Sequence, residues 1–199
     1  MLQAMRKDAA YNRQAVVAAA KRLYIEEGSG VSMRAIAREA GVGVATATRH
    51  FPDRVTLCEA VFEQVFGEAK RIVDAHVASF EQDPGGAWRE AVHGIVSLQI
   101  PALAQAIFTE LARENGLAEI RARFDRAAEA RVSELYAPLL EKAGEAGLCK
   151  KGLDPLRFHL ALAAVSSTLP VTGWLGEQYA DQQDYVADVF LDGLKAQAE

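Results

Sequence analysis

Residues 35–51 read AIAREAGVGVATATRHF, and this stretch decides the fold. Its side chains are almost all small until it ends in a cationic and aromatic run. Gly41 divides it into two short helical segments, of which the second covers residues 44–50. Two short helices joined at a glycine are typical of a helix-turn-helix, whose second helix enters the major groove of DNA. Small side chains let that backbone approach the bases, and cations near its end suit the phosphates.

Apolar residues recur at helical spacing on both sides of this stretch, and no useful run alternates with a period of two. The sequence therefore predicts an all-α fold of about nine helices. One amphipathic helix precedes the motif and ends at Gly28. The later helices are expected over a long segment from Asp53 to before Asp83, then over 87–98, 102–114, 117 onward with a disturbance at Pro138, 155–175 and 182–198.

The charge of the chain is unevenly distributed, although its formal total is −5. Residues 1–57 hold nine Lys and Arg against five Asp and Glu, and the remainder holds thirteen against twenty-two. A basic head on an acidic body indicates that only the head meets a polyanion.

The sequence predicts a cytoplasmic protein that does not enter a membrane. It shows no signal peptide, and its longest apolar stretch, Leu160–Leu175, is too short and too polar to span a bilayer. Cys58 and Cys149 lie far apart, which favours reduced thiols.

The stretch from Asn12 to Phe62 resembles the TetR family of transcriptional regulators, with SMRAIAREAGV followed by TATRHFPDRVTLCEAVF. The resemblance implies a three-helix DNA-binding domain over 1–52 and a helical ligand-binding and dimerisation domain over 53–199. It also implies a homodimer, built mainly from the last two helices, that binds double-stranded DNA at a palindromic operator.

The resemblance further implies which side chains meet DNA. The sequence matches the family at three kinds of position: the start of the second helix, the exposed start of the recognition helix, and the usual phosphate contacts. These residues are Ser32, Arg34, Val44, Ala45, Thr46, Thr48, Arg49, His50 and Arg54. Thr48 is shorter than the Tyr that is usual there, and Val44 replaces a residue that is often polar, so base readout would depend more on Arg34 and Thr46.

The acidic body offers two groups of candidate residues. Aromatic and polar side chains of the middle helices are candidates for a small-molecule pocket, with core packing as the alternative for each; they are Phe66, Trp88, His93, Phe108, Phe124 and Tyr136. The last two helices are candidates for the dimer interface, with burial inside one subunit as the alternative; their residues are Leu160, Ala164, Trp174, Val186, Val189, Phe190, Gly193 and Leu194.

Enzyme signatures are missing from the sequence. The four histidines are scattered, without HExxH spacing, and no phosphate-binding glycine loop or GxSxG occurs. We therefore expect no catalytic residues, no metal site and no cofactor. The sequence favours a DNA-binding regulator, a repressor released by a small-molecule ligand. The alternatives are a DNA-binding dimer without a ligand and a small helical enzyme or carrier.

Overall fold

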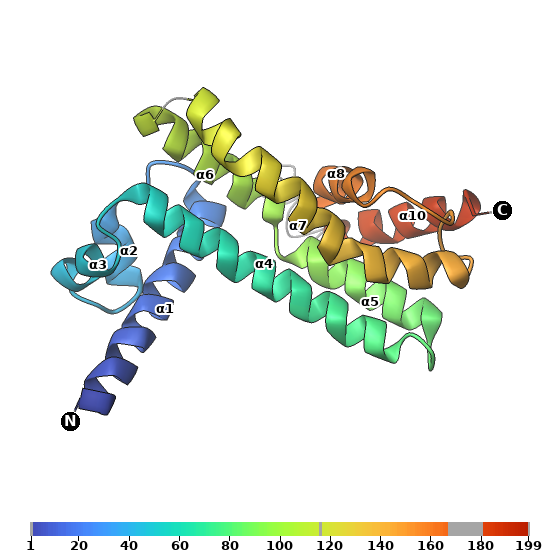
Figure 1. Cartoon of the computed structure of the whole chain (residues 1–199), viewed down its shortest axis with the longest axis horizontal. Coiled ribbons are helices and arrows are strands. Elements are labelled where there is room, and N and C mark those ends of the chain that lie inside the picture. The colour runs from blue at the N-terminus through green and yellow to red at the C-terminus, as the bar shows by residue number, and fades with distance from the viewer. Residues whose placement is uncertain (1, 116, 167–180, 199) are drawn as a thin grey trace. The chain divides into compact units, whose positions relative to one another are not determined.

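The computed structural model describes residues 2–115, 117–166 and 181–198, and side chains there except those of residues 2–7, 114–115 and 117–128. Every regular element in these ranges is an α-helix, which confirms the all-α prediction (Figure 1). The elements are α1 (Leu2–Glu27), α2 (Met33–Glu39), α3 (Val44–His50), α4 (Arg54–Ser79), α5 (Pro84–Ser97), α6 (Ile100–Asn115), α7 (Leu117–Glu145), α8 (Pro155–Ser166) and α10 (Gln182–Ala196).

The chain forms two compact units, and neither is a continuous segment. Unit 1 comprises residues 1–66 and 102–121, and unit 2 comprises 67–101 and 122–199. The first part of α4 and most of α6 thus belong to the same unit as the helix-turn-helix. The units therefore do not coincide with the predicted boundary at residues 52–53.

Helices begin where the sequence provides capping side chains. The pairs are Ser32 Oγ with the Ala35 N–H (3.1 Å), Asp53 Oδ1 with the Thr56 N–H (2.7 Å), Asp83 Oδ1 with the Gly86 N–H (2.9 Å) and Asp154 Oδ1 with the Arg157 N–H (2.7 Å). Because Asp83 caps α5 and a proline follows it, this helix begins at Pro84, earlier than the predicted residue 87.

Helix α7 continues through Pro138 to Glu145, so the predicted disturbance does not end it. A proline inside a helix costs about 3 kcal/mol, because it removes one hydrogen bond and crowds the preceding turn. Tyr136 and Leu139 on either side of it are fully buried, and burial of each large apolar side chain contributes about 1.5–3 kcal/mol. Packing of these neighbours outweighs the local cost.

Unit 1 is built around α1, against which α2 and α3 both pack (Figure 1). The buried apolar side chains come from α1, α2, α3, α4 and α6 and include Val16, Ala20, Ile36, Ala47, Leu57, Val61, Ile107 and Leu111. Phe51, directly after α3, is 1% exposed and lies beneath the Arg13 guanidinium, 5.0 Å from its ring centre. Phe51 therefore belongs to the core of unit 1.

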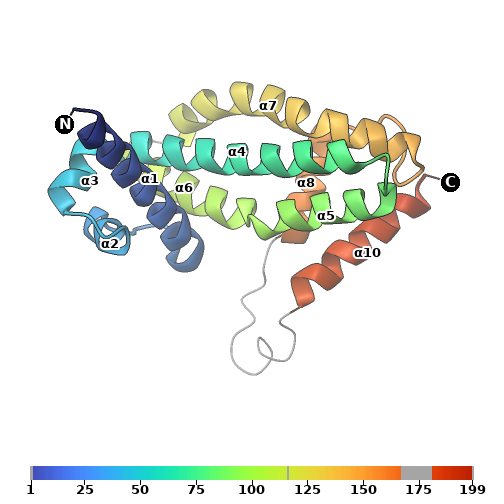
Figure 2. The ribbon, with the colours of Figure 1, turned by 90° about the horizontal axis from the view of Figure 1, so that it is seen from below.

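Unit 2 contains α5, α8 and α10 packed pairwise on one another (Figure 2). Where α4 passes α5, Gly94 lies so close to Ile72 that a Cβ on it would meet the Ile72 Cγ2 at 3.0 Å. Between α5 and α6, Gln99 has a φ of +52°, which ends the first helix before the second begins.

The stretch Pro84–Arg113 is long and apolar enough to cross a membrane by length and composition alone. Core helices of soluble proteins pass the same test. In the structure this stretch consists of α5 and α6, and α5 buries six side chains, Ala87, Trp88, Ala91, Val92, Ile95 and Val96.

Candidate functional site

Helices α2 and α3 present an exposed surface because their other faces are anchored in unit 1. Ile36 and Ala37 of α2 and Ala47 of α3 are fully buried. Gly41, with a φ of +67°, makes the turn between the two helices, a backbone conformation that L side chains rarely adopt. The start of α3 is therefore held outward, and the Val44 side chain is 45% exposed.

The exposed side chains of this surface are small or cationic. Ser32, Arg34, Val44, Ala45, Thr48 and Arg49 are all exposed, and Thr46 is half-buried among them. A hollow of about 440 Å³ lies over the start of α2 and the turn, lined by Ser32, Arg34, Ala35, Arg38, Val42, Gly43 and Val44. We call this surface, together with Thr46, Thr48 and Arg49, the α2–α3 surface.

Arg38 is a member of this surface that sequence reasoning missed. It is exposed and lines the hollow together with Arg34, one helical turn earlier. The spacing of four residues between the two arginines was the available signal, because residues i and i+4 share one face of a helix. Two cations on one face of α2 make it a candidate to hold phosphate groups.

Two predicted phosphate contacts are placed differently from the rest. His50 is half-buried, and its Nε2 is buried with no hydrogen-bond partner in the part of the chain that the structure describes. Arg54 does not join the exposed surface, since its side chain is 19% exposed and is directed to Glu110. In the structure Arg54 is thus paired with Glu110, and its contact with a phosphate stays a prediction.

Glu110 of α6 is a buried carboxylate in unit 1, with its side chain 8% exposed. Its Oε1 lies 3.4 Å from the Arg54 Nε, and its Oε2 accepts the Gly30 N–H at 2.8 Å. Nearby, the Tyr24 hydroxyl and the Cys58 thiol are 3.8 Å apart, and burial followed by the charge of Cys58 raises the Tyr24 pKa. This polar cluster joins α1, α4 and α6.

The predicted pocket residues do not all come together. Phe66 and Phe108 belong to unit 1, where Phe108 contacts Phe62 with ring centres 6.1 Å apart. Trp88, His93 and Tyr136 belong to unit 2. The Phe124 side chain lies outside the described residues.

An aromatic cluster in unit 2 is centred on Phe158 of α8, which sequence reasoning missed. Trp88 stacks on Phe158 at 5.5 Å, Tyr136 meets it edge-on at 5.3 Å and Phe190 stacks on it at 6.1 Å between ring centres. Trp88 is 3% exposed, and its Nε1 is buried with no hydrogen-bond partner among the described residues. A buried donor of this kind is rare and would be satisfied by an acceptor on a bound molecule.

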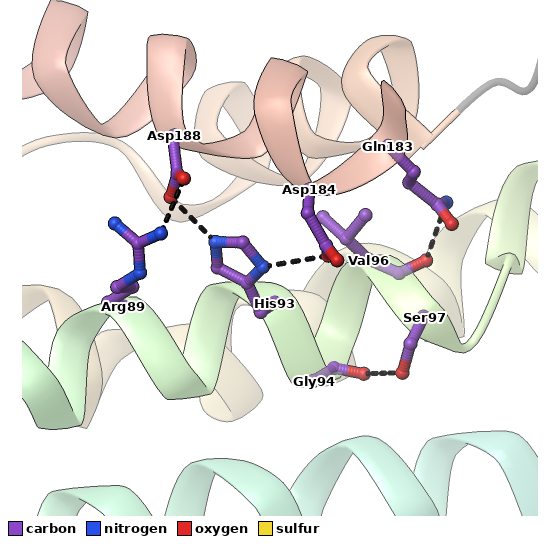
Figure 3. A network of polar contacts seen from close by, with 8 residues as sticks. All are labelled: Arg89, His93, Gly94, Val96, Ser97, Gln183, Asp184 and Asp188. Carbon is purple, nitrogen blue, oxygen red and sulfur yellow. Dashed lines mark hydrogen bonds and ion pairs between the residues drawn. The ribbon is translucent and has the colours of Figure 1, made fainter. Parts of the chain in front are cut away.

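His93 lies in a polar network between α5 and α10 (Figure 3). Its Nδ1 is 3.0 Å from Asp184 Oδ1 and its Nε2 is 2.8 Å from Asp188 Oδ1, while Arg89 also pairs with Asp188. Burial acts to raise the pKa of Asp188, but hydrogen bonds from His93 and Arg89 and their charges lower it overall. Its observed contacts thus place His93 in a link between two helices.

The candidate interface residues on α8 and α10 divide into two groups. Leu160 (62% exposed), Val189 (54% exposed), Ala164 and Gly193 are exposed, as is Tyr185. Phe190 stacks on Phe158, and Val186 is half-buried. Leu194 is buried within the subunit, which agrees with the alternative of burial inside one chain. Trp174 lies outside the described residues.

Comparison with known proteins identifies relatives of both the motif and the fold. Residues 16–61 match the family described as "Bacterial regulatory proteins, tetR family". An HTH-type transcriptional regulator of Staphylococcus aureus strain USA300 is 40% identical over 79 residues, or 39% of each chain. The match thus spans about two fifths of the length of that curated relative.

Two solved structures resemble nearly the whole chain. A TetR transcriptional regulator from Streptomyces coelicolor has a TM-score of 0.64 at 26% identity, over 92% of this chain and 97% of the other. A TetR transcription regulatory protein from Mycobacterium vanbaalenii has a TM-score of 0.57 at 27% identity, over 96% and 98%.

Proposed function

We propose that the chain is a regulator of the tetR family, because residues 16–61 match that family and a solved TetR regulator shares its fold, and that it binds a palindromic operator as a homodimer in the cytoplasm. We further propose that it acts as a repressor and that a small molecule releases it from DNA. The observation that carries the proposal is the α2–α3 surface, where exposed arginines flank a recognition helix with little side-chain bulk.

Some side chains of the α2–α3 surface contribute to affinity for any DNA duplex, and others to the recognition of base sequence. Arg38 and Arg49 bind phosphates, which adds affinity for any duplex. Arg34 and Thr46 carry hydrogen bonds to base edges, and Val44 and Ala45 make apolar contacts such as those with thymine methyl groups. Readout by few hydrogen bonds favours an operator in which methyl positions matter.

Fluorescence anisotropy with the upstream intergenic duplex and a scrambled duplex, each over a salt series, tests DNA binding. We expect tighter binding to the upstream duplex and a steep loss of affinity with salt. Arg34→Ala should lose about 1–3 kcal/mol of discrimination between the two duplexes. Arg49→Ala should weaken both alike. Weak, salt-insensitive binding to both duplexes would contradict the proposal.

Release by a small molecule is supported by the aromatic cluster of unit 2. The ligand proposed is a planar, apolar molecule with a hydrogen-bond acceptor, which would pack on the rings around Phe158 and pair with the Trp88 Nε1, a donor without a partner among the described residues. The matched probes are 2-acetylnaphthalene, which carries a carbonyl acceptor, and 2-ethylnaphthalene, which does not.

Binding of the two probes, followed by calorimetry, should favour the ketone by up to about tenfold, since a net hydrogen bond contributes about 0.5–1.5 kcal/mol. Trp88→Phe should abolish this preference, and the ketone should weaken operator binding by the wild-type protein. Equal binding of both probes, or an unchanged operator affinity, would argue for a DNA-binding dimer without a ligand.

A further inference from the structure

We propose that Glu110 is a positioning residue that holds Arg54 away from DNA. As a result, each subunit makes one phosphate contact fewer than the family pattern of the motif implies. The inference rests on the DNA-binding function proposed above, and it concerns unit 1 alone.

The burial of the pair shows why Arg54 stays with Glu110. The two side chains are 19% and 8% exposed, with Nε and Oε1 3.4 Å apart. If Arg54 turned outward to a phosphate, the Glu110 carboxylate would remain buried without a cation. An uncompensated buried charge is strongly unfavourable, whereas a phosphate contact at the protein surface is weakened by solvent and salt.

The arginine itself is also withdrawn from solvent. Its Nη1 is buried and has no hydrogen-bond partner among the described residues, so the guanidinium has lost water without replacing every bond. Arg34, Arg38 and Arg49 differ, because each is exposed on the α2–α3 surface. The cations available to DNA in this part of unit 1 are therefore these three rather than Arg54.

The second carboxylate oxygen of Glu110 binds the turn that precedes α2. It accepts the N–H of Gly30, which has a φ of +91° in the turn between α1 and α2. The next residue, Val31, is buried, and Ser32 then caps α2. The Glu110 carboxylate thus holds both the turn that leads into the α2–α3 surface and the Arg54 side chain, which it keeps away from that surface.

The experiment measures the salt dependence of DNA binding for wild type, Arg54→Gln, Glu110→Gln and the double variant. For each, anisotropy on the upstream and scrambled duplexes is followed between about 50 and 200 mM salt. Arg54→Gln should keep the wild-type slope. Glu110→Gln frees the guanidinium, so its slope should steepen by about 0.9 for each bound subunit. Over this salt range, that is about a 3.5-fold larger loss of affinity per subunit.

Glu110→Gln should also bind both duplexes more tightly than wild type at low salt, because the added contact carries no sequence information. The double variant should return to the wild-type slope. The control is Arg49→Gln, which removes an exposed arginine of the same unit and should flatten the slope by about 0.9 per subunit.

A flatter slope for Arg54→Gln, like that of Arg49→Gln, would overturn the inference and make Arg54 a phosphate contact. This result decides the question even if Glu110→Gln fails to fold, which circular dichroism would show. An unchanged slope in folded Glu110→Gln would also overturn it. Failure of the wild-type protein to bind either duplex would instead contradict the proposed function, so the two failures are distinguishable.

Discussion

At the residue scale, His159 of α8 shows how burial controls protonation in unit 2. Its Nδ1 lies 3.4 Å from the Tyr136 hydroxyl, and burial lowers the pKa of the imidazole. Burial also raises the Tyr136 pKa, so the phenol keeps its proton. A protonated imidazole has no acceptor nitrogen, so it could keep this contact only by donating to the phenol oxygen.

The first prediction concerns the pH dependence of stability. A histidine with a lowered folded pKa binds fewer protons in the folded than in the unfolded state. The free energy of unfolding should therefore fall as the pH drops through the ordinary His value of about 6.5. Urea unfolding at several pH values between about 7.5 and 5.5 measures the slope. His159→Gln should make it shallower.

The matched control for this prediction is His76→Gln. The His76 Nδ1 lies 3.6 Å from a carboxylate oxygen of the exposed Glu90, and the His76 side chain is 22% exposed. Its removal should not make the slope shallower. If His159→Gln and wild type show the same slope, then burial of His159 does not contribute to acid sensitivity.

Site residues were predictable where a local pattern places them, and unpredictable where a distant residue does. The positions of Arg34 and Val44 were implied by the resemblance of the motif, and both side chains are exposed. The pairing of Arg54 with Glu110 was not predictable, because Glu110 lies on α6, far along the chain. Phe158 was missed for a similar reason, since nothing near it in sequence indicates that three other rings converge on it.

At the element scale, helix boundaries were the most predictable feature of this chain. Caps and glycines act within a few residues, so α3 was predicted with its observed ends and α8 with its observed start. The course of α7 beyond Pro138 was not predictable locally, because burial of its neighbours decides it. The fit of α5 against α4 likewise depends on a contact between two helices, the one at Gly94.

The second prediction compares two helical glycines of unit 2. A Cβ on Gly67 of α4 would meet nothing within 4 Å, whereas one on Gly94 of α5 would press on Ile72. Gly67→Ala should raise the free energy of unfolding by about 0.5–1 kcal/mol, the usual gain of alanine in a helix. Gly94→Ala should raise the free energy of unfolding by less than this, or lower it. Denaturant midpoints of the two variants measure the difference, and equal gains would show that α4 and α5 are not tightly fitted.

At the scale of the whole molecule, the side chains of α10 divide into those that pack inside one subunit and those left exposed for the proposed dimer contact. Leu194 and Phe190 pack within the subunit, while Val189 and Gly193 are exposed. The sequence stripe could not distinguish these groups, because all four are compatible with one broad helix face. Only the positions of α5 and α8 decide which part of that face is already covered.

The third prediction follows for the proposed dimer. Val189→Glu should dissociate it, because a charge would replace an exposed apolar side chain in the interface, while the fold of the subunit should be unaffected. Sedimentation velocity measures the assembly and circular dichroism the fold. Leu194→Ala is the contrasting variant, and it should lower stability by about 2–5 kcal/mol because it leaves a cavity inside the subunit. A dimer that withstands Val189→Glu would place the interface elsewhere.

The discontinuous make-up of unit 1 limits the modularity of this protein. A designer who wished to transplant its DNA-reading part onto another sensor would be tempted to cut after the motif. That cassette would lack the segment of α6 that carries Glu110 and Phe108. Glu110 contacts Gly30 and Arg54, and Phe108 contacts Phe62. A transplantable cassette must therefore carry two pieces of chain, residues 1–66 and 102–121, and the recipient scaffold must join them.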